Sequence, residues 1–122
     1  MRSITREIRV RIEANLVEAR LSRSQREWGR CWELLEDAHV LSQPFAGLHT
    51  RVHAAMLMTG WKERDAREVR GQLLRLVVGG PASTVGRYPD GNTGRARVRA
   101  TQPMSVRSDL AEMLTRAGRP IG

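Results

Sequence analysis

Apolar residues recur at helical spacing through the first two thirds of the chain. In the first stretch an isoleucine or leucine stands at every fourth position from Ile4 to Leu16, and Ser3 is placed to cap the N-terminus. This pattern predicts a helix over about residues 4–22. Three further stretches with the same period begin near Ser24, Pro44 and Asp65. Four helices joined by short links are expected to pack as antiparallel pairs.

Local signals indicate where these helices begin and end. Ser24–Glu27 and Asp65–Glu68 match the capping box, in which a side chain at each end satisfies the backbone of the first turn. Gly60 is expected to end the third helix, and Gly79-Gly80-Pro81 the fourth. The four helices are therefore expected within residues 3–78.

The helical period then stops, and residues 79–107 have neither a helical nor an alternating apolar pattern. Two turn signals lie among them, Pro89-Asp90-Gly91 and Asn92-Thr93-Gly94. Such specific turn chemistry favours a long ordered loop over a disordered linker. A short last helix over residues 108–117 is expected to follow the loop, and residues 118–122 form a tail that frays.

The pattern as a whole predicts one all-α domain over residues 1–122, with four to five helices. They form a small bundle or pairs of the tetratricopeptide kind, a form that the spacing Trp32-x-x-Leu35-x-x-Ala38 supports. The long loop is expected to fold over one end of the helices, before the last of them.

Composition and charge narrow the class of protein. The chain has 122 residues and a net charge of +8, and no apolar run is long enough for a membrane span. The charged N-terminus lacks the apolar stretch of a signal peptide, so the expected compartment is the cytoplasm. The single cysteine, Cys31, excludes an intramolecular disulfide and a cysteine-rich zinc ribbon, and its apolar neighbours indicate an inert thiol.

Much of the excess positive charge lies in the long loop. Between residues 86 and 107 there are five arginines and one acidic residue. An acidic protein or a nucleic acid could bind this segment, at Arg95, Arg97 and Arg99. Only Tyr88 is available there to stack on bases, which weakens the case for nucleic acid.

The three histidines are the strongest chemical signal in the sequence. His49 and His53 are four residues apart, so one face of the third helix presents both imidazoles to a common ion. His39 ends the second helix, and the short link before the third folds it back beside them. Glu36, three residues earlier, forms the only E-x-x-H pair, which favours a mononuclear site over a di-iron one. We therefore expect His39, His49 and His53 as ligands, with Glu36 as a fourth ligand or as an acceptor behind an imidazole.

The sequence leaves the nature of this site open. The metal could be iron, copper or zinc, or the iron of a haem, and Met56 offers a soft ligand for copper or haem iron. A methionine at this position also suits the core. The H-x-x-x-H spacing lacks the glutamate of H-E-x-x-H and is frequent by chance. The alternative is therefore three core histidines bonded to carbonyls or carboxylates.

Four motifs in sequence order resemble a family of short bacterial proteins catalogued only as a domain of unknown function. They are Ala38-His39-x-Leu41-x-Gln43, His49-x-x-Val52-His53, Gly71-Gln72-Leu73-x-Arg75-Leu76 and Pro89-x-Gly91-Asn92-Thr93-Gly94. The resemblance implies a gene that often lies near heavy-metal resistance genes, and it places the three histidines, both glutamines and the last turn among the family's signature positions. The basic run Arg95–Arg99 departs from the family pattern, so the resemblance implies no role for it.

Two functions follow from these observations. The first is a small protein that binds a metal ion or haem, as a metal-dependent enzyme or as a binding protein. In it Gln43, Gln72 and the turn Asn92, Thr93 and Gly94 hold a small-molecule substrate or orient an imidazole. The second is a non-enzymatic interaction module whose helix pairs and basic loop bind an acidic partner. Oligomers are compatible with either function.

Overall fold

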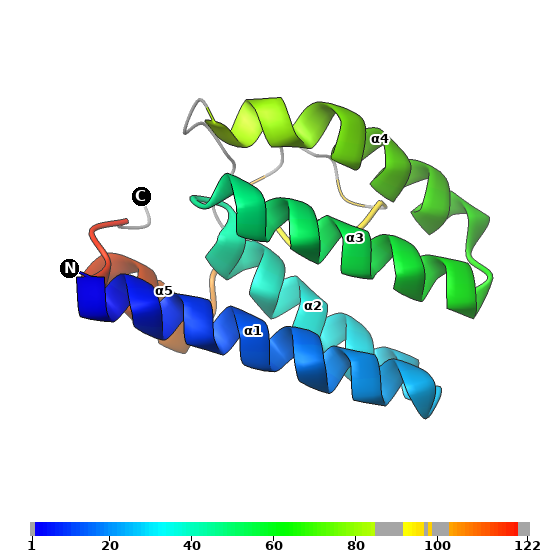
Figure 1. Cartoon of the computed structure of the whole chain (residues 1–122), viewed down its shortest axis with the longest axis horizontal. Helices are drawn as coiled ribbons and strands as arrows, with labels where there is room; N and C mark the ends of the chain where they lie inside the picture. The colour runs from blue at the N-terminus through cyan, green and yellow to red at the C-terminus, as the bar shows by residue number, and fades with distance from the viewer. Residues whose placement is uncertain (1, 85–91, 97, 99–102, 120–122) are drawn as a thin grey trace.

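The chain folds as an all-α protein, as the apolar pattern predicts. The computed structural model describes residues 2–84, 92–96, 98 and 103–119, and these contain five helices and no strand (Figure 1). The helices are α1 (Arg2–Ser24), α2 (Trp28–Ser42), α3 (Ala46–Glu63), α4 (Ala66–Thr84) and α5 (Ser108–Arg116). None of those described is long and apolar enough to cross a membrane.

The first four helices form two antiparallel hairpins. Helix α1 packs chiefly on α2, and α3 packs chiefly on α4, while α2 and α3 join the two hairpins (Figure 1). Helix α5 packs on α1 and α2 beside the N-terminus of the chain. The order of the helices therefore places the end of α2 and the start of α3 in the interior, between the two hairpins.

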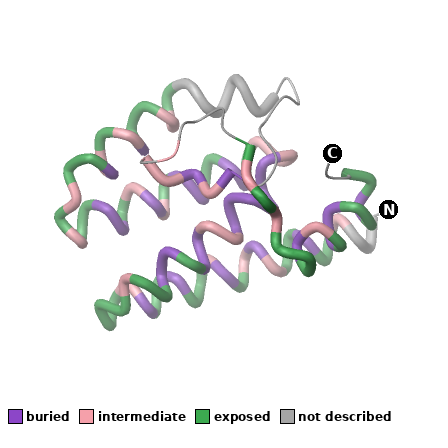
Figure 2. Tube along the Cα trace, turned by 180° about the vertical axis from the view of Figure 1, so that it is seen from behind, coloured by how far each residue is buried: buried purple, intermediate pink, exposed green. Residues whose placement is uncertain are grey.

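One apolar core runs between the helices. Buried positions recur along their inner sides, whereas the outward sides are exposed (Figure 2). Met56 is fully buried in this core, so the structure places its thioether among apolar side chains. Cys31 is also fully buried, and its Sγ lies 3.5 Å from the Thr59 hydroxyl.

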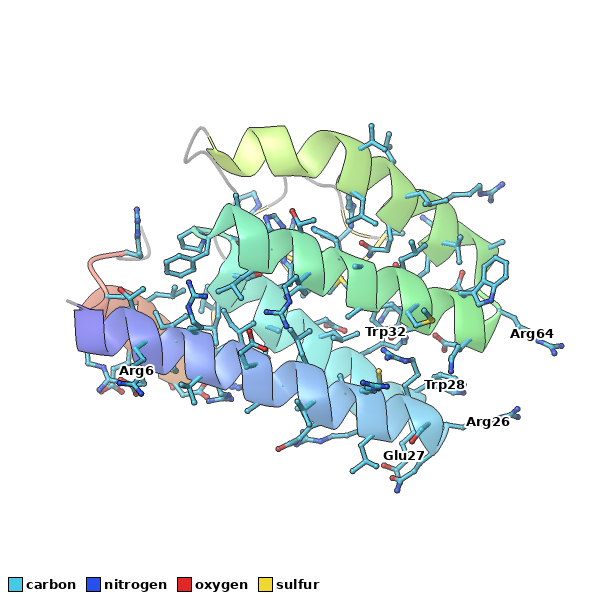
Figure 3. All side chains as sticks on the ribbon, in the orientation of Figure 1. Arg6, Arg26, Glu27, Trp28, Trp32 and Arg64 are labelled. Carbon is cyan, nitrogen blue, oxygen red and sulfur yellow. The ribbon has the colours of Figure 1, made fainter. Side chains whose placement is uncertain are left out.

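The turn between α1 and α2 differs from the predicted capping box. Ser24 still belongs to α1, where its hydroxyl donates to the Leu21 carbonyl, and Glu27 makes no side-chain cap. The chain reverses instead through Arg26, whose φ of 58° lies in the left-handed region. Figure 3 shows that Arg26 and Arg64, at the two hairpin turns, point away from the bundle. Helix α2 consequently begins at Trp28.

Helices α3 and α4 both pass the glycines that were expected to end them. Helix α3 continues beyond Gly60 to Glu63 and ends on Arg64, with φ 64°. Helix α4 continues through Gly79, Gly80 and Pro81 to Thr84, six residues beyond the predicted end. A glycine costs a helix about 1 kcal/mol and an interior proline about 3 kcal/mol or more, yet α4 continues through both residue types.

The long loop is consequently shorter than predicted, and only part of it is described. Its first turn, Pro89-Asp90-Gly91, lies outside the described residues, whereas Asn92–Ala96 are described and lie against α4. The last helix ends as expected, because Gly118 follows it with a φ of 76° and the Arg119 amide bonds back to the Leu114 carbonyl.

A candidate metal centre

Three imidazoles meet where the end of α2 faces the start of α3. The Nε2 atoms of His39 and His49 are 3.0 Å apart, those of His49 and His53 2.8 Å, and those of His39 and His53 3.2 Å. All three side chains are buried, with 3%, 8% and 4% of their surfaces exposed. Their ring nitrogens lie close enough together to hold one metal ion. We call these three residues the triad.

Two of the imidazoles are held in one tautomer by oxygen atoms that can only accept hydrogen bonds. His39 Nδ1 lies 2.6 Å from the Asn92 carbonyl oxygen, and His53 Nδ1 lies 2.6 Å from Gln72 Oε1. Both Nδ1 atoms must therefore carry the proton, and both Nε2 atoms are left with a bare lone pair. These lone pairs face each other at 3.2 Å. Two bare lone pairs at this distance repel each other. A shared cation relieves this repulsion, and so does a proton on the Nε2 atom of the third imidazole, His49.

The orientation of the Gln72 amide follows from its other contacts. Its Nε2 donates to the Glu68 carboxylate at 3.0 Å and to the Gly94 carbonyl at 2.8 Å. Both partners are acceptors, so the NH2 group must face them and Oε1 must face His53. Helix α4 thus supplies the acceptor that orients one ligand of the triad.

Residues 92–96, which we call the strap, supply the acceptor for His39. The strap turns tightly because the Gly94 amide donates to the Asn92 side-chain oxygen, and Gly94 has a φ of 81°. A Cβ at Gly94 would lie 2.4 Å from the His39 ring. Only glycine therefore combines this backbone conformation with such close contact to the imidazole.

Burial keeps the triad uncharged near neutral pH. Desolvation, followed by the neighbouring imidazoles, lowers the pKa of His39 well below its ordinary value. The same causes lower the pKa of His49 to about 4. Desolvation also lowers the pKa of His53, although the hydrogen bond to Gln72 opposes it. Neutral imidazole is the form that coordinates metal, so burial prepares all three rings for an ion.

The other residues that the sequence singled out divide into two groups. Gln72, Asn92 and Gly94 lie at the triad, and Thr93 lies between the last two in the strap. Glu36 lies outside the triad, because its carboxylate is drawn to the Arg95 guanidinium 3.5 Å away. Gln43 is buried at the C-terminal end of α2.

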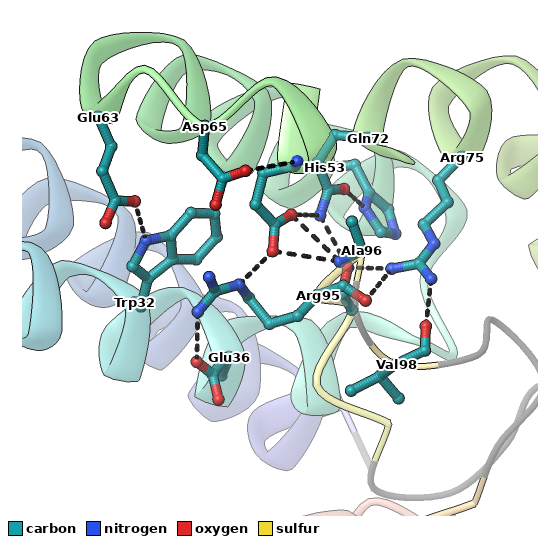
Figure 4. Close-up of polar contacts among 12 residues, drawn as sticks. Trp32, Glu36, His53, Glu63, Asp65, Gln72, Arg75, Arg95, Ala96 and Val98 are labelled. Atoms are coloured by element: carbon teal, nitrogen blue, oxygen red, sulfur yellow. Dashed lines mark hydrogen bonds and ion pairs between the residues drawn. The ribbon is translucent and has the colours of Figure 1, made fainter. Parts of the chain in front are cut away.

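Arg95, which the sequence offered to an acidic partner, contacts acidic side chains of the protein itself. Its guanidinium bonds the carboxylates of Glu68 and Glu36, and its Cζ lies 3.6 Å from the centre of the Trp32 ring (Figure 4). Its positive charge is therefore paired with two carboxylates of the same chain. Arg97 and Arg99 lie outside the described residues.

Two polar residues of α4 hold the strap, and the sequence pattern did not indicate this role for either of them. Arg75 donates to the carbonyls of Gly94, Arg95 and Val98. Glu68 was assigned to a capping box, of which only half forms, since the Asp65 carboxylate accepts the Glu68 amide at 3.2 Å. The Glu68 side chain turns inward instead. Its spacing of four residues from Gln72 was the one signal of this role.

These features define a small all-helical protein with a buried histidine triad that could hold a metal ion. Over residues 6–114 the chain matches the family described as protein of unknown function (DUF3703), and it belongs to that family. No curated protein and no solved structure matches it. The triad is therefore the feature of the molecule that bears on its function.

Proposed function

We propose that the protein binds one transition-metal ion through the Nε2 atoms of His39, His49 and His53. The observation that carries this proposal is the pair of fixed tautomers, which aims two bare lone pairs at each other beside a third imidazole. Imidazole nitrogens suit zinc, copper, iron and nickel, whereas magnesium and calcium prefer oxygen ligands. The ion belongs to the first group.

The three Nε2 atoms, which lie 2.8–3.2 Å from one another, would hold the ion together. Three protein ligands would leave a coordination position for water or a small molecule. Three histidines and one exchangeable position are the ligand set of a catalytic zinc site, so this arrangement serves an enzyme as well as a binding protein.

Haem, which the sequence left open, cannot take all three imidazoles of the triad as ligands to its iron. A porphyrin occupies four positions around its iron and leaves two axial ones on opposite faces, about 4 Å from each other at ordinary bond lengths. The three Nε2 atoms instead converge at 2.8–3.2 Å. The proposal is therefore limited to a single non-haem ion.

Metal analysis and titration test this function. Purified wild-type protein is expected to bind close to one equivalent of Zn²⁺ or Co²⁺, and each single variant His39→Ala, His49→Ala and His53→Ala is expected to lose at least a hundredfold in affinity. Met56→Leu is the matched control, because it alters a buried side chain of the same core and leaves every imidazole in place.

A protein that fails to bind metal would identify the three histidines as ordinary residues of the buried core. Wild-type protein that binds neither Zn²⁺, Co²⁺, Cu⁺ nor Fe²⁺ at micromolar concentrations would overturn the proposal. Triad variants that bind the ion as tightly as the wild-type protein would also overturn it.

A further inference from the structure

A fully buried carboxylate lies behind the triad and bonds two separate segments of the chain. Glu68 on α4 is 0% exposed. Its Oε2 accepts from the Gln72 amide at 3.0 Å, and its Oε1 accepts from the Arg95 guanidinium. The Ala96 backbone amide donates to the two oxygens at 3.2 Å and 3.1 Å (Figure 4). Burying a charged group is costly, so a carboxylate kept in this position needs these partners.

The first connection runs from Glu68 through Gln72 to His53. A carboxylate only accepts hydrogen bonds, so it holds the NH2 group of Gln72 toward itself and turns Oε1 toward the imidazole. The Oε1 atom in turn holds the proton on His53 Nδ1. Glu68, together with the Gly94 carbonyl, thereby determines which nitrogen of His53 is free.

The second connection runs from Glu68 through the strap to His39. Arg95 and Ala96 anchor one end of the strap on the carboxylate, and the Asn92 carbonyl at the other end accepts from His39 Nδ1. The strap reaches the carboxylate because Gly71 has no side chain, since a Cβ there would lie 2.4 Å from that of Ala96. One carboxylate is thus connected to two of the three imidazoles.

We infer that Glu68 is the positioning residue of the triad, which fixes the tautomers of His39 and His53 through two separate connections. The inference rests on the proposed metal binding, because its purpose is to leave the Nε2 lone pairs of both rings free for the ion. Groups that orient metal-bound histidines in this way change metal affinity by about 10–100-fold when they are removed.

Nitrogen NMR of the histidine rings in metal-free protein tests the inference without any metal. In the wild-type protein both rings are expected as the Nδ1–H tautomer. In Glu68→Gln the new amide presents N–H donors to Gln72, so the Gln72 amide can turn and His53 gains the Nε2–H form. Glu13→Gln is the matched control, because it breaks the ion pair with Arg51 on α3 without touching α4 or the strap.

Titration with Co²⁺ gives the second readout. Glu68→Gln is expected to weaken Co²⁺ binding 10–100-fold and to change the visible absorption of the bound ion, whereas Glu13→Gln changes neither. Wild-type tautomers and wild-type affinity in Glu68→Gln would overturn the inference. If the wild-type protein binds no Co²⁺ and yet Glu68→Gln changes the tautomers, the proposed function fails and the positioning role stands.

A second variant keeps the inference testable if Glu68→Gln does not fold. Gln72→Met removes the connection to His53 together with the hydrogen bond to the Gly94 carbonyl, and it leaves the strap held by Glu68 and Arg75. The His53 ring is then expected to change tautomer while His39 keeps its proton on Nδ1. A change in both rings, or in neither, would contradict two separate connections.

Discussion

At the scale of single residues, the low pKa of each imidazole makes the stability of the metal-free protein depend on pH. An unfolded histidine titrates near pH 6.5, and His49 in the folded protein titrates near pH 4. Below pH 6.5 the unfolded chain therefore binds more protons than the folded protein, and the free energy of unfolding falls as the pH falls. Between these two pH values His49 contributes a slope of up to about 1.4 kcal/mol per pH unit.

Urea denaturation of metal-free protein between pH 7.5 and pH 4.5 measures this slope. The wild-type protein is expected to lose stability throughout the acid range, and His49→Gln is expected to lose less over the same range. Equal slopes for the two proteins would show that His49 is not held neutral by the fold.

The same low pKa values change the pH at which a bound ion is released. A free imidazole begins to lose metal below about pH 6.5, because protons compete for its lone pair. Burial moves this competition to lower pH for all three rings. We expect Zn²⁺ retention to persist at pH 6 and to fall toward pH 4, as measured by dialysis and metal analysis. Release already complete at pH 6 would contradict the assignment of these ligands.

At the scale of elements, the close contact between α4 and the strap depends on one helical glycine. Gly71→Ala replaces a poor helix former, but its Cβ would lie 2.4 Å from that of Ala96. We expect the strap to move away and Co²⁺ affinity to fall at least tenfold. Gly29→Ala in α2 is the matched control, because nothing lies within 4 Å of its Cβ. It is expected to keep the wild-type affinity and to gain up to about 1 kcal/mol of stability.

Titration of the two glycine variants with Co²⁺, together with their thermal melting, separates helix propensity from strap contact. Equal affinities in Gly71→Ala and Gly29→Ala would mean that the position of the strap does not govern the metal site.

The sequence predicted what depends on local spacing and missed what depends on long-range contact. The spacing of His49 and His53, and the position of His39 before a short link, were enough to bring the triad together. Glu68 has its strap partners 27 and 28 residues later in the chain, and its local spacing also matched a cap. Only the packing of the strap on α4 decides between these two roles.

Helix ends were the least predictable part of the fold for a related reason. The glycines near the predicted ends of α3 and α4 lower helix propensity by about 1 kcal/mol each, which packing easily outweighs. The turn at Arg26 uses a left-handed arginine, a residue type that gives no turn signal. The periodic spacing of apolar residues combines the signal of many positions, so it predicted the helices themselves reliably. The end of a helix depends on one or two residues, so it was predicted less well.

At the scale of the whole molecule, a bound ion would connect the two hairpins. His39 belongs to α2 of the first hairpin, and His49 and His53 belong to α3 of the second. An ion that binds only the folded protein adds about 2.7 kcal/mol to the free energy of unfolding when its free concentration is a hundred times Kd. Urea unfolding with Zn²⁺ and with a chelator is expected to differ by this amount in the wild-type protein. A His53→Gln variant that shifts as much as the wild-type protein would contradict the cross-link.

The stacking of Arg95 on Trp32 gives the protein an optical property of its own. Trp32 is 4% exposed, with the guanidinium on its face and its ring nitrogen donating to Glu63 at 2.7 Å. Trp61 is 69% exposed and gives a background from water-exposed indole that does not involve the strap. Because Arg95 belongs to the strap, any release of the strap uncovers one specific indole to water and to soluble quenchers. Intrinsic fluorescence therefore reports the state of a segment that itself contains no tryptophan.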